Sequence, residues 1–80
     1  MDIKILGKGC AKCLKLEAMT RETLAALGRT ADVTHVTDVA EIVSYSVMST
    51  PALVIDGVVK VEGHMPRREE LAAWLTPAQR

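Results

Sequence analysis

The alternation of apolar and polar residues along the chain predicts four short strands. They are Ile3–Leu6, Ala31–Val36, Ala52–Ile55 and Val58–Val61. Gly7 and Gly9 end the first strand. Asp56-Gly57 separates the last two, and this dipeptide between β-rich runs predicts a hairpin, because a type I′ turn needs positive φ at both central residues.

Three segments have helical periodicity. The longest, Ala11–Leu27, places one apolar face along Leu16, Met19, Thr23, Leu24 and Leu27, and Gly28 suits the left-handed position after its last turn. Asp38 and Glu41 have capping-box spacing, which predicts a short helix through about Ser44.

The last predicted helix follows Gly63. Pro66 fits its first turn, and Leu71, Trp74 and Leu75 form its apolar stripe. Pro77 stops the helix, so residues 76–80 are expected to be a C-terminal tail.

The resulting order is strand, helix, strand, helix, strand, strand, helix, in one domain of residues 1–80. A helical crossover makes the first two strands parallel, and the hairpin makes the last two antiparallel. The sequence therefore predicts an α/β fold with a four-stranded mixed sheet. Two-layer and three-layer packing both satisfy this order.

Composition narrows the classes of function. Ten basic residues balance ten acidic ones, and Tyr45 and Trp74 are the only aromatic residues. Neither a long-range attraction to nucleic acid or anionic lipid nor base stacking is expected. No apolar run approaches the about 20 residues of a membrane span, and the N-terminus does not resemble a signal peptide. We therefore expect a cytoplasmic protein.

The candidate chemistry lies in Cys10 and Cys13, between the first strand and the first helix. Two cysteines three positions apart at a helix start share one face of the first turn, close enough for a disulfide. The helix dipole, with Lys8 and Lys12, stabilises a thiolate at Cys10. We predict that Cys10 attacks a partner disulfide and that the more buried Cys13 resolves the mixed disulfide, with no metal or organic cofactor.

Other interpretations of the same residues stay open. The cysteines could be small buried hydrophobes, or two thiolates holding a soft ion such as Cu(I) or Zn(II). A closed zinc site needs four ligands, and His35 and His64 lack the spacing to complete one. His35 is predicted to be an ordinary strand residue and His64 a solvent-facing loop residue, and Met48 and Met65 core or loop filling.

Thr50-Pro51 precedes the third strand. A proline at the first residue of a strand is compatible with the sheet. From the sequence alone, an ordinary trans bond is expected before Pro51.

The strand-helix order, the Cys-x-x-Cys before the first helix and the Thr-Pro before the hairpin together resemble the thioredoxin fold. The resemblance rests on residues 3–13 and 48–57 and on Gly63 and Pro66. More narrowly, the chain resembles minimal, glutaredoxin-sized thioredoxin-like proteins described as redox-active disulfide proteins.

The resemblance implies that the Thr50–Pro51 bond is cis and lies against the cysteine pair, where Thr50 and Pro51 help to bind an extended partner segment. There are departures: Gly9 stands where thioredoxins usually have an aromatic residue, and Ala11-Lys12 replaces Gly-Pro. Many thioredoxins also have a buried acidic residue on the first strand, and Lys4 is its nearest counterpart here. Glutaredoxins have residues near the last helix that help to hold glutathione, and the region around Gly63 does not match them.

The function expected is thiol–disulfide exchange by a monomer, with protein disulfides and an upstream reductase as partners. The first alternative is a soft-metal carrier or sensor that uses the same two thiolates. Heavy-metal-associated domains, however, end in a strand, whereas this chain is predicted to end in the helix that contains Trp74. The second alternative is a non-catalytic docking module that uses the edge at Thr50-Pro51.

Overall fold

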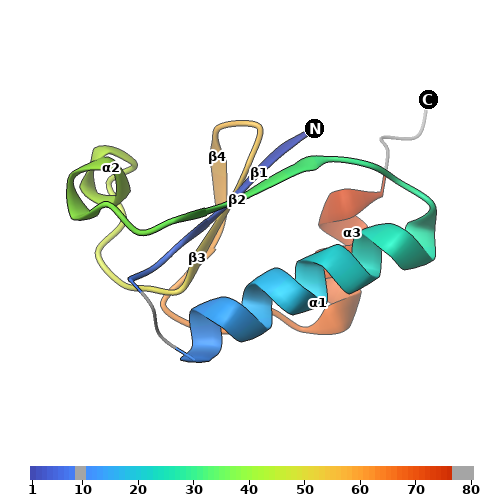
Figure 1. Cartoon of the computed structure of the whole chain (residues 1–80). Helices are drawn as coiled ribbons and strands as arrows, with labels where there is room; N and C mark the ends of the chain where they lie inside the picture. The colour runs from blue at the N-terminus through green and yellow to red at the C-terminus, as the bar shows by residue number, and fades with distance from the viewer. Residues whose placement is uncertain (9–10, 77–80) are drawn as a thin grey trace.

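The computed structural model describes residues 1–8 and 11–76. Within them the chain forms four strands and three helices: β1 (Asp2–Leu6), α1 (Ala11–Leu27), β2 (Asp32–Val36), α2 (Val39–Ser44), β3 (Ala52–Ile55), β4 (Val58–Glu62) and α3 (Arg68–Leu75). The predicted α/β class and element order are confirmed (Figure 1). Most of the expected tail, residues 77–80, lies outside the described residues.

The strands form one mixed sheet in the order β2-β1-β3-β4. β1 runs parallel to β2 and antiparallel to β3, and β3 runs antiparallel to β4. β1 is therefore an inner strand, hydrogen-bonded on both sides. Its carboxyl end leads directly into the segment that carries the cysteines.

The hairpin between β3 and β4 has the geometry that Asp-Gly predicts. Asp56 has a φ of 50° and Gly57 a φ of 84°, as a type I′ turn requires. The register shifts between Leu53 and Val54, since Leu53 faces Val61 and Val54 faces Val59. One extra residue in β4 therefore forms a bulge.

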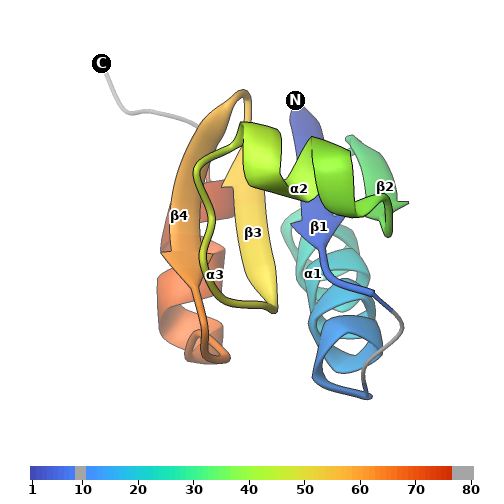
Figure 2. The same ribbon diagram turned by 90° about the vertical axis from the view of Figure 1, so that its left-hand side faces the viewer.

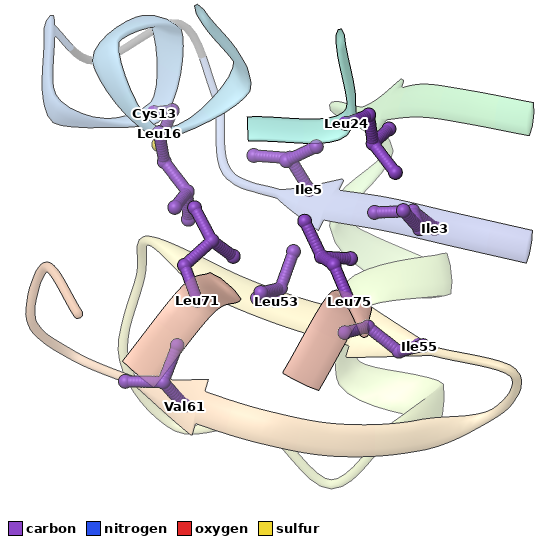
Figure 3. Packing of buried hydrophobic residues seen from close by; sticks show 10 residues of the cluster. All are labelled: Ile3, Ile5, Cys13, Leu16, Leu24, Leu53, Ile55, Val61, Leu71 and Leu75. Carbon is purple, nitrogen blue, oxygen red and sulfur yellow. The ribbon is translucent and has the colours of Figure 1, made fainter. Parts of the chain in front are cut away.

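The sheet lies between two helical layers. The sequence had left two-layer and three-layer packing open, and the structure has three layers. Helices α1 and α3 cover one face and α2 covers the other (Figures 1 and 2). The larger core lies on the α1–α3 face; its buried residues are Ile3, Ile5, Cys13, Leu16, Leu24, Leu53, Ile55, Val61, Leu71 and Leu75 (Figure 3). The smaller core lies under α2 and consists of Leu6, Val36, Ile42, Val47, Ala52 and Val54.

The buried line of α1 differs from the predicted one. It consists of Cys13, Leu16, Thr20 and Leu24, whereas Leu27 is exposed. Thr20 is compatible with the core because its hydroxyl donates a hydrogen bond of 2.8 Å to the carbonyl of Leu16. The predicted apolar face did not include Thr20.

The start of one of the two shorter helices agrees with the prediction, and the start of the other does not. The Asp38 side chain caps α2 by accepting from the amide of Ala40, as predicted. The prediction for Pro66 is wrong, because α3 begins at Arg68 and Pro66 precedes it. The first turn of α3 is instead closed by Glu70, which accepts from the amide of Arg67 at 3.0 Å. None of the helices in the described residues has the length and apolar character of a membrane span.

Candidate functional site

Cys13 lies in the first turn of α1 and is completely buried. Its side chain joins the larger core, where it and Leu16 lie on the side of α1 that faces Leu71 of α3 (Figure 3). Cys10 lies outside the described residues, and the sequence places it directly before Ala11, the first residue of α1. The structure therefore places one member of the predicted pair, at a buried position.

Gly7 packs against the sulfur of Cys13. A Cβ added to Gly7 would overlap Sγ of Cys13 and would lie 3.2 Å from its Cβ. A side chain at position 7 therefore cannot coexist with the observed place of the sulfur. The sequence suggested only that Gly7 ends the first strand; its close approach to Cys13 is a further reason for glycine there.

The Thr50–Pro51 segment meets the same place. Its peptide bond is cis, as the resemblance implied. Pro51 is buried and Thr50 is exposed. The Cβ of Thr50 would lie 3.6 Å from a Cβ on Gly7, so that Thr50 and Cys13 flank one side of Gly7. Residues from three separate parts of the chain converge here.

The loop before Pro51 is held by β4 and the residue after it. The Glu62 carboxylate accepts from the amide of Met48 at 3.0 Å, and the amide of Gly63 donates to the carbonyl of Pro51 at 2.9 Å. The side chain of Met48 is 91% exposed. The loop is therefore anchored through its backbone while it presents an apolar side chain to solvent.

The charges near the start of α1 favour a thiolate. Its first turn contains no acidic residue, and Lys8 and Lys12 are exposed beside it. The first turn of a helix also carries unsatisfied amides and the positive end of the dipole. Both contributions stabilise negative charge on a cysteine at this end of α1.

Lys4 lies on the other face of the sheet. It alternates with Ile3 and Ile5 of the larger core and forms a 2.8 Å ion pair with Asp2. The hydrogen bond from Lys4 to Asp2 raises the pKa of Lys4 above its usual value, against a smaller opposing effect of desolvation. Lys4 therefore does not face Cys13 and has no direct contact with its sulfur.

His35 is the residue whose role the sequence did not indicate. It was predicted to be an ordinary strand residue, yet its Nε2 lies 2.9 Å from the carbonyl oxygen of Gly7 and its Nδ1 lies 3.4 Å from Glu17. Alternation along β2 could have placed His35 on the α1 face, but not beside the loop that contacts Cys13. His64 is exposed, as predicted. In residues 1–8 and 11–76 no three His, Cys, Asp or Glu side chains gather as a metal site would require.

A central mixed sheet between helical layers, with a cysteine in the first turn of α1 beside a cis-proline loop, defines a protein of the thioredoxin-fold class. The family model for the thioredoxin domain matches residues 1–76. A thioredoxin of Methanothermobacter thermautotrophicus is 34% identical over 76 residues, covering 95% of this chain and 99% of the relative. A thioredoxin of Methanocaldococcus jannaschii is 38% identical over 69 residues, covering 86% of this chain and 79% of the relative.

The chain therefore belongs to the thioredoxin family. At the level of the family it is an oxidoreductase of the thioredoxin type, and thioredoxins act on protein disulfides together with a reductase.

Proposed function

We propose that this protein exchanges a Cys10–Cys13 dithiol for disulfides in partner proteins. The observation that carries the proposal is the position of Cys13, which is buried in the first turn of α1 next to Gly7 and the Thr50–Pro51 loop. A buried second thiol suits an intramolecular attack better than an attack on a large partner. Cys10, directly before α1 in sequence, is the other member of the couple.

The reaction proceeds in two displacements. The Cys10 thiolate attacks one sulfur of the partner disulfide, a mixed disulfide forms, and the other partner sulfur leaves as a thiolate. The Cys13 thiolate then attacks Sγ of Cys10, closes the Cys10–Cys13 disulfide and releases the second partner thiolate. Two electrons pass to the partner, and an upstream dithiol reductase returns two electrons to this protein.

The test is a redox titration of the purified protein, with the thiols counted by a mass-shifting alkylating agent. We expect a two-electron transition that is lost in Cys10→Ser. We further expect Cys13→Ser to accumulate a mixed disulfide with a protein substrate such as insulin, because the second displacement is blocked. Two alkylated thiols under oxidising conditions, or stoichiometric bound metal without a redox transition, would overturn the proposal in favour of the soft-metal alternative.

We further propose that Thr50 and Pro51 position an extended segment of the partner. The exposed side chain of Thr50, the buried ring of Pro51 and the backbone anchors at Met48 and Pro51 support this role. An anchored loop offers backbone groups to a partner strand without a large cost in ordering entropy.

A bulky residue at the exposed position separates docking from chemistry. In Thr50→Trp we expect kcat/KM for insulin reduction to fall about tenfold, equivalent to about 1.4 kcal/mol. The reduction of a small aromatic disulfide should stay close to that of the unmodified protein. The matched control is Thr30→Trp, at an exposed threonine before β2. Equal effects on both substrates, or on both variants, would refute this role.

The cytoplasmic location and the monomeric state stay predictions.

A further inference from the structure

A small polar cluster lies between β2 and α1, next to the proposed redox site. Its centre is His35, whose side chain is only 17% exposed. One ring nitrogen faces the loop after β1, with Nε2 at 2.9 Å from the carbonyl oxygen of Gly7. The other faces α1, with Nδ1 at 3.4 Å from Oε1 of Glu17. The ring therefore joins three segments that are distant in sequence.

The donor and acceptor roles follow from the partners. A carbonyl oxygen only accepts, so the contact at 2.9 Å requires the hydrogen on Nε2 of His35. Glu17 is itself held in place, because Arg21 donates to its other oxygen at 3.0 and 3.2 Å. Arg21 also donates to the carbonyl of Val33 in β2 at 3.4 Å. Glu17 thus lies on the side of the imidazole opposite to Gly7, in a place fixed by Arg21.

Both backbone polar groups of Gly7 are bound to β2. Its amide donates to the carbonyl of Val36 at 3.0 Å, and its carbonyl accepts from His35. The Cα of Gly7 meanwhile lies so close to Sγ of Cys13 that a Cβ could not be placed there. Gly7 therefore covers the buried sulfur, and β2 holds Gly7 in that place.

We propose that His35 is a positioning residue that keeps Gly7 seated over Cys13. The hydrogen bond from Nε2 fixes the loop at the point where it covers the second thiol. Cys13 thereby stays closed to outside reagents while it remains within the redox site. This role rests on the proposed function of Cys13 as the resolving thiol, and it assigns the control of access to that thiol to a histidine on β2.

The experiment measures how fast Cys13 is alkylated in native conditions. In a Cys10→Ser background Cys13 is the single thiol, so that iodoacetamide reports on it alone. We expect His35→Leu to raise the rate about tenfold, because leucine cannot donate to the Gly7 carbonyl. His35→Gln should restore the slow rate, since the glutamine amide nitrogen can occupy nearly the position of Nε2 and carries hydrogens.

Denaturant separates local opening from loss of global stability. The extra labelling in His35→Leu should be nearly independent of low urea concentrations, because the movement of Gly7 exposes little surface. The matched control is His64→Leu, the same substitution at an exposed histidine, which should leave the rate unchanged. Labelling that rises with urea as global unfolding does, or equal rates in His35→Leu and His35→Gln, would overturn the positioning role.

The two proposals fail in different ways. The alkylation experiment needs no redox activity, because Cys10 is absent from the protein tested. If the redox titration finds no couple while the labelling rates behave as expected, the proposed function fails and the cover over Cys13 stands. If the couple is present and the labelling rates do not change, only the role of His35 is refuted.

Discussion

Replacing Gly7 with alanine tests the close packing on which the site depends. The added methyl group would overlap Sγ of Cys13, with the Cβ of Cys13 at 3.2 Å and that of Thr50 at 3.6 Å. Cys13 has no exposed surface, and α1 and the core around Leu16 and Leu71 lie behind it. Because the sulfur is enclosed by these residues, we expect the loop that contains Gly7 to shift instead.

The magnitude follows from the cost of inserting one methyl group into a packed site. Overpacking costs about 1–3 kcal/mol, and the enclosed sulfur places Gly7→Ala near the upper end. The loss of glycine flexibility in the unfolded chain offsets about 0.4–1 kcal/mol of this. We expect the free energy of unfolding to fall by about 2 kcal/mol. For a chain of this size that lowers Tm by about 8–16 °C.

The assay is urea and thermal unfolding under reducing conditions, so that the thiols are in the same state in every variant. A double-mutant cycle with Cys13→Ala isolates the steric cause, because alanine removes the sulfur that the methyl group would overlap. In the Cys13→Ala background most of the cost of Gly7→Ala should disappear, and only the 3.2 Å contact with the remaining Cβ should be left. An equal cost in both backgrounds, or no cost in either, would refute the steric explanation.

Two further predictions concern the frame around the site. Nη1 of Arg29 donates to the carbonyl of Leu75, at the end of α3, at 2.8 Å. Arg29→Met should therefore lower the free energy of unfolding by about 1 kcal/mol and speed amide exchange at the end of α3. Unchanged exchange in α3 would contradict this prediction. Lys4→Met should remove stability that the unmodified protein has at neutral pH. Folding raises the pKa of Lys4. The difference in the free energy of unfolding between the unmodified protein and Lys4→Met should therefore be full below about pH 10.4, the pKa of an unfolded lysine, and should shrink as the pH rises through the pKa of Lys4 in the folded state. Urea unfolding at a series of pH values measures this difference. A difference that grows with pH would reverse the sign of the argument.

The cysteine motif illustrates how far local sequence reaches toward a functional site. The spacing of Cys10 and Cys13 and the helix that follows them are local features, and the start of α1 at Ala11 agrees with the prediction. The cis bond before Pro51 could be expected only through the resemblance to thioredoxins, because the local sequence is equally compatible with a trans bond. The local sequence also does not indicate that Pro51 lies near Cys13. The approach of Thr50 to Gly7 and Cys13 depends on how the sheet and α1 pack.

By itself, the sequence determined the order of strands and helices, the hairpin at Asp56-Gly57 and the cap at Asp38, because each depends on neighbours within a few residues. Tertiary structure decided the three layers, the buried line of α1 through Thr20, and the contact between His35 and Gly7. Those features arise from packing between segments, and the last joins residues 28 positions apart. No periodicity in a single segment encodes which distant backbone carbonyl a histidine will bind.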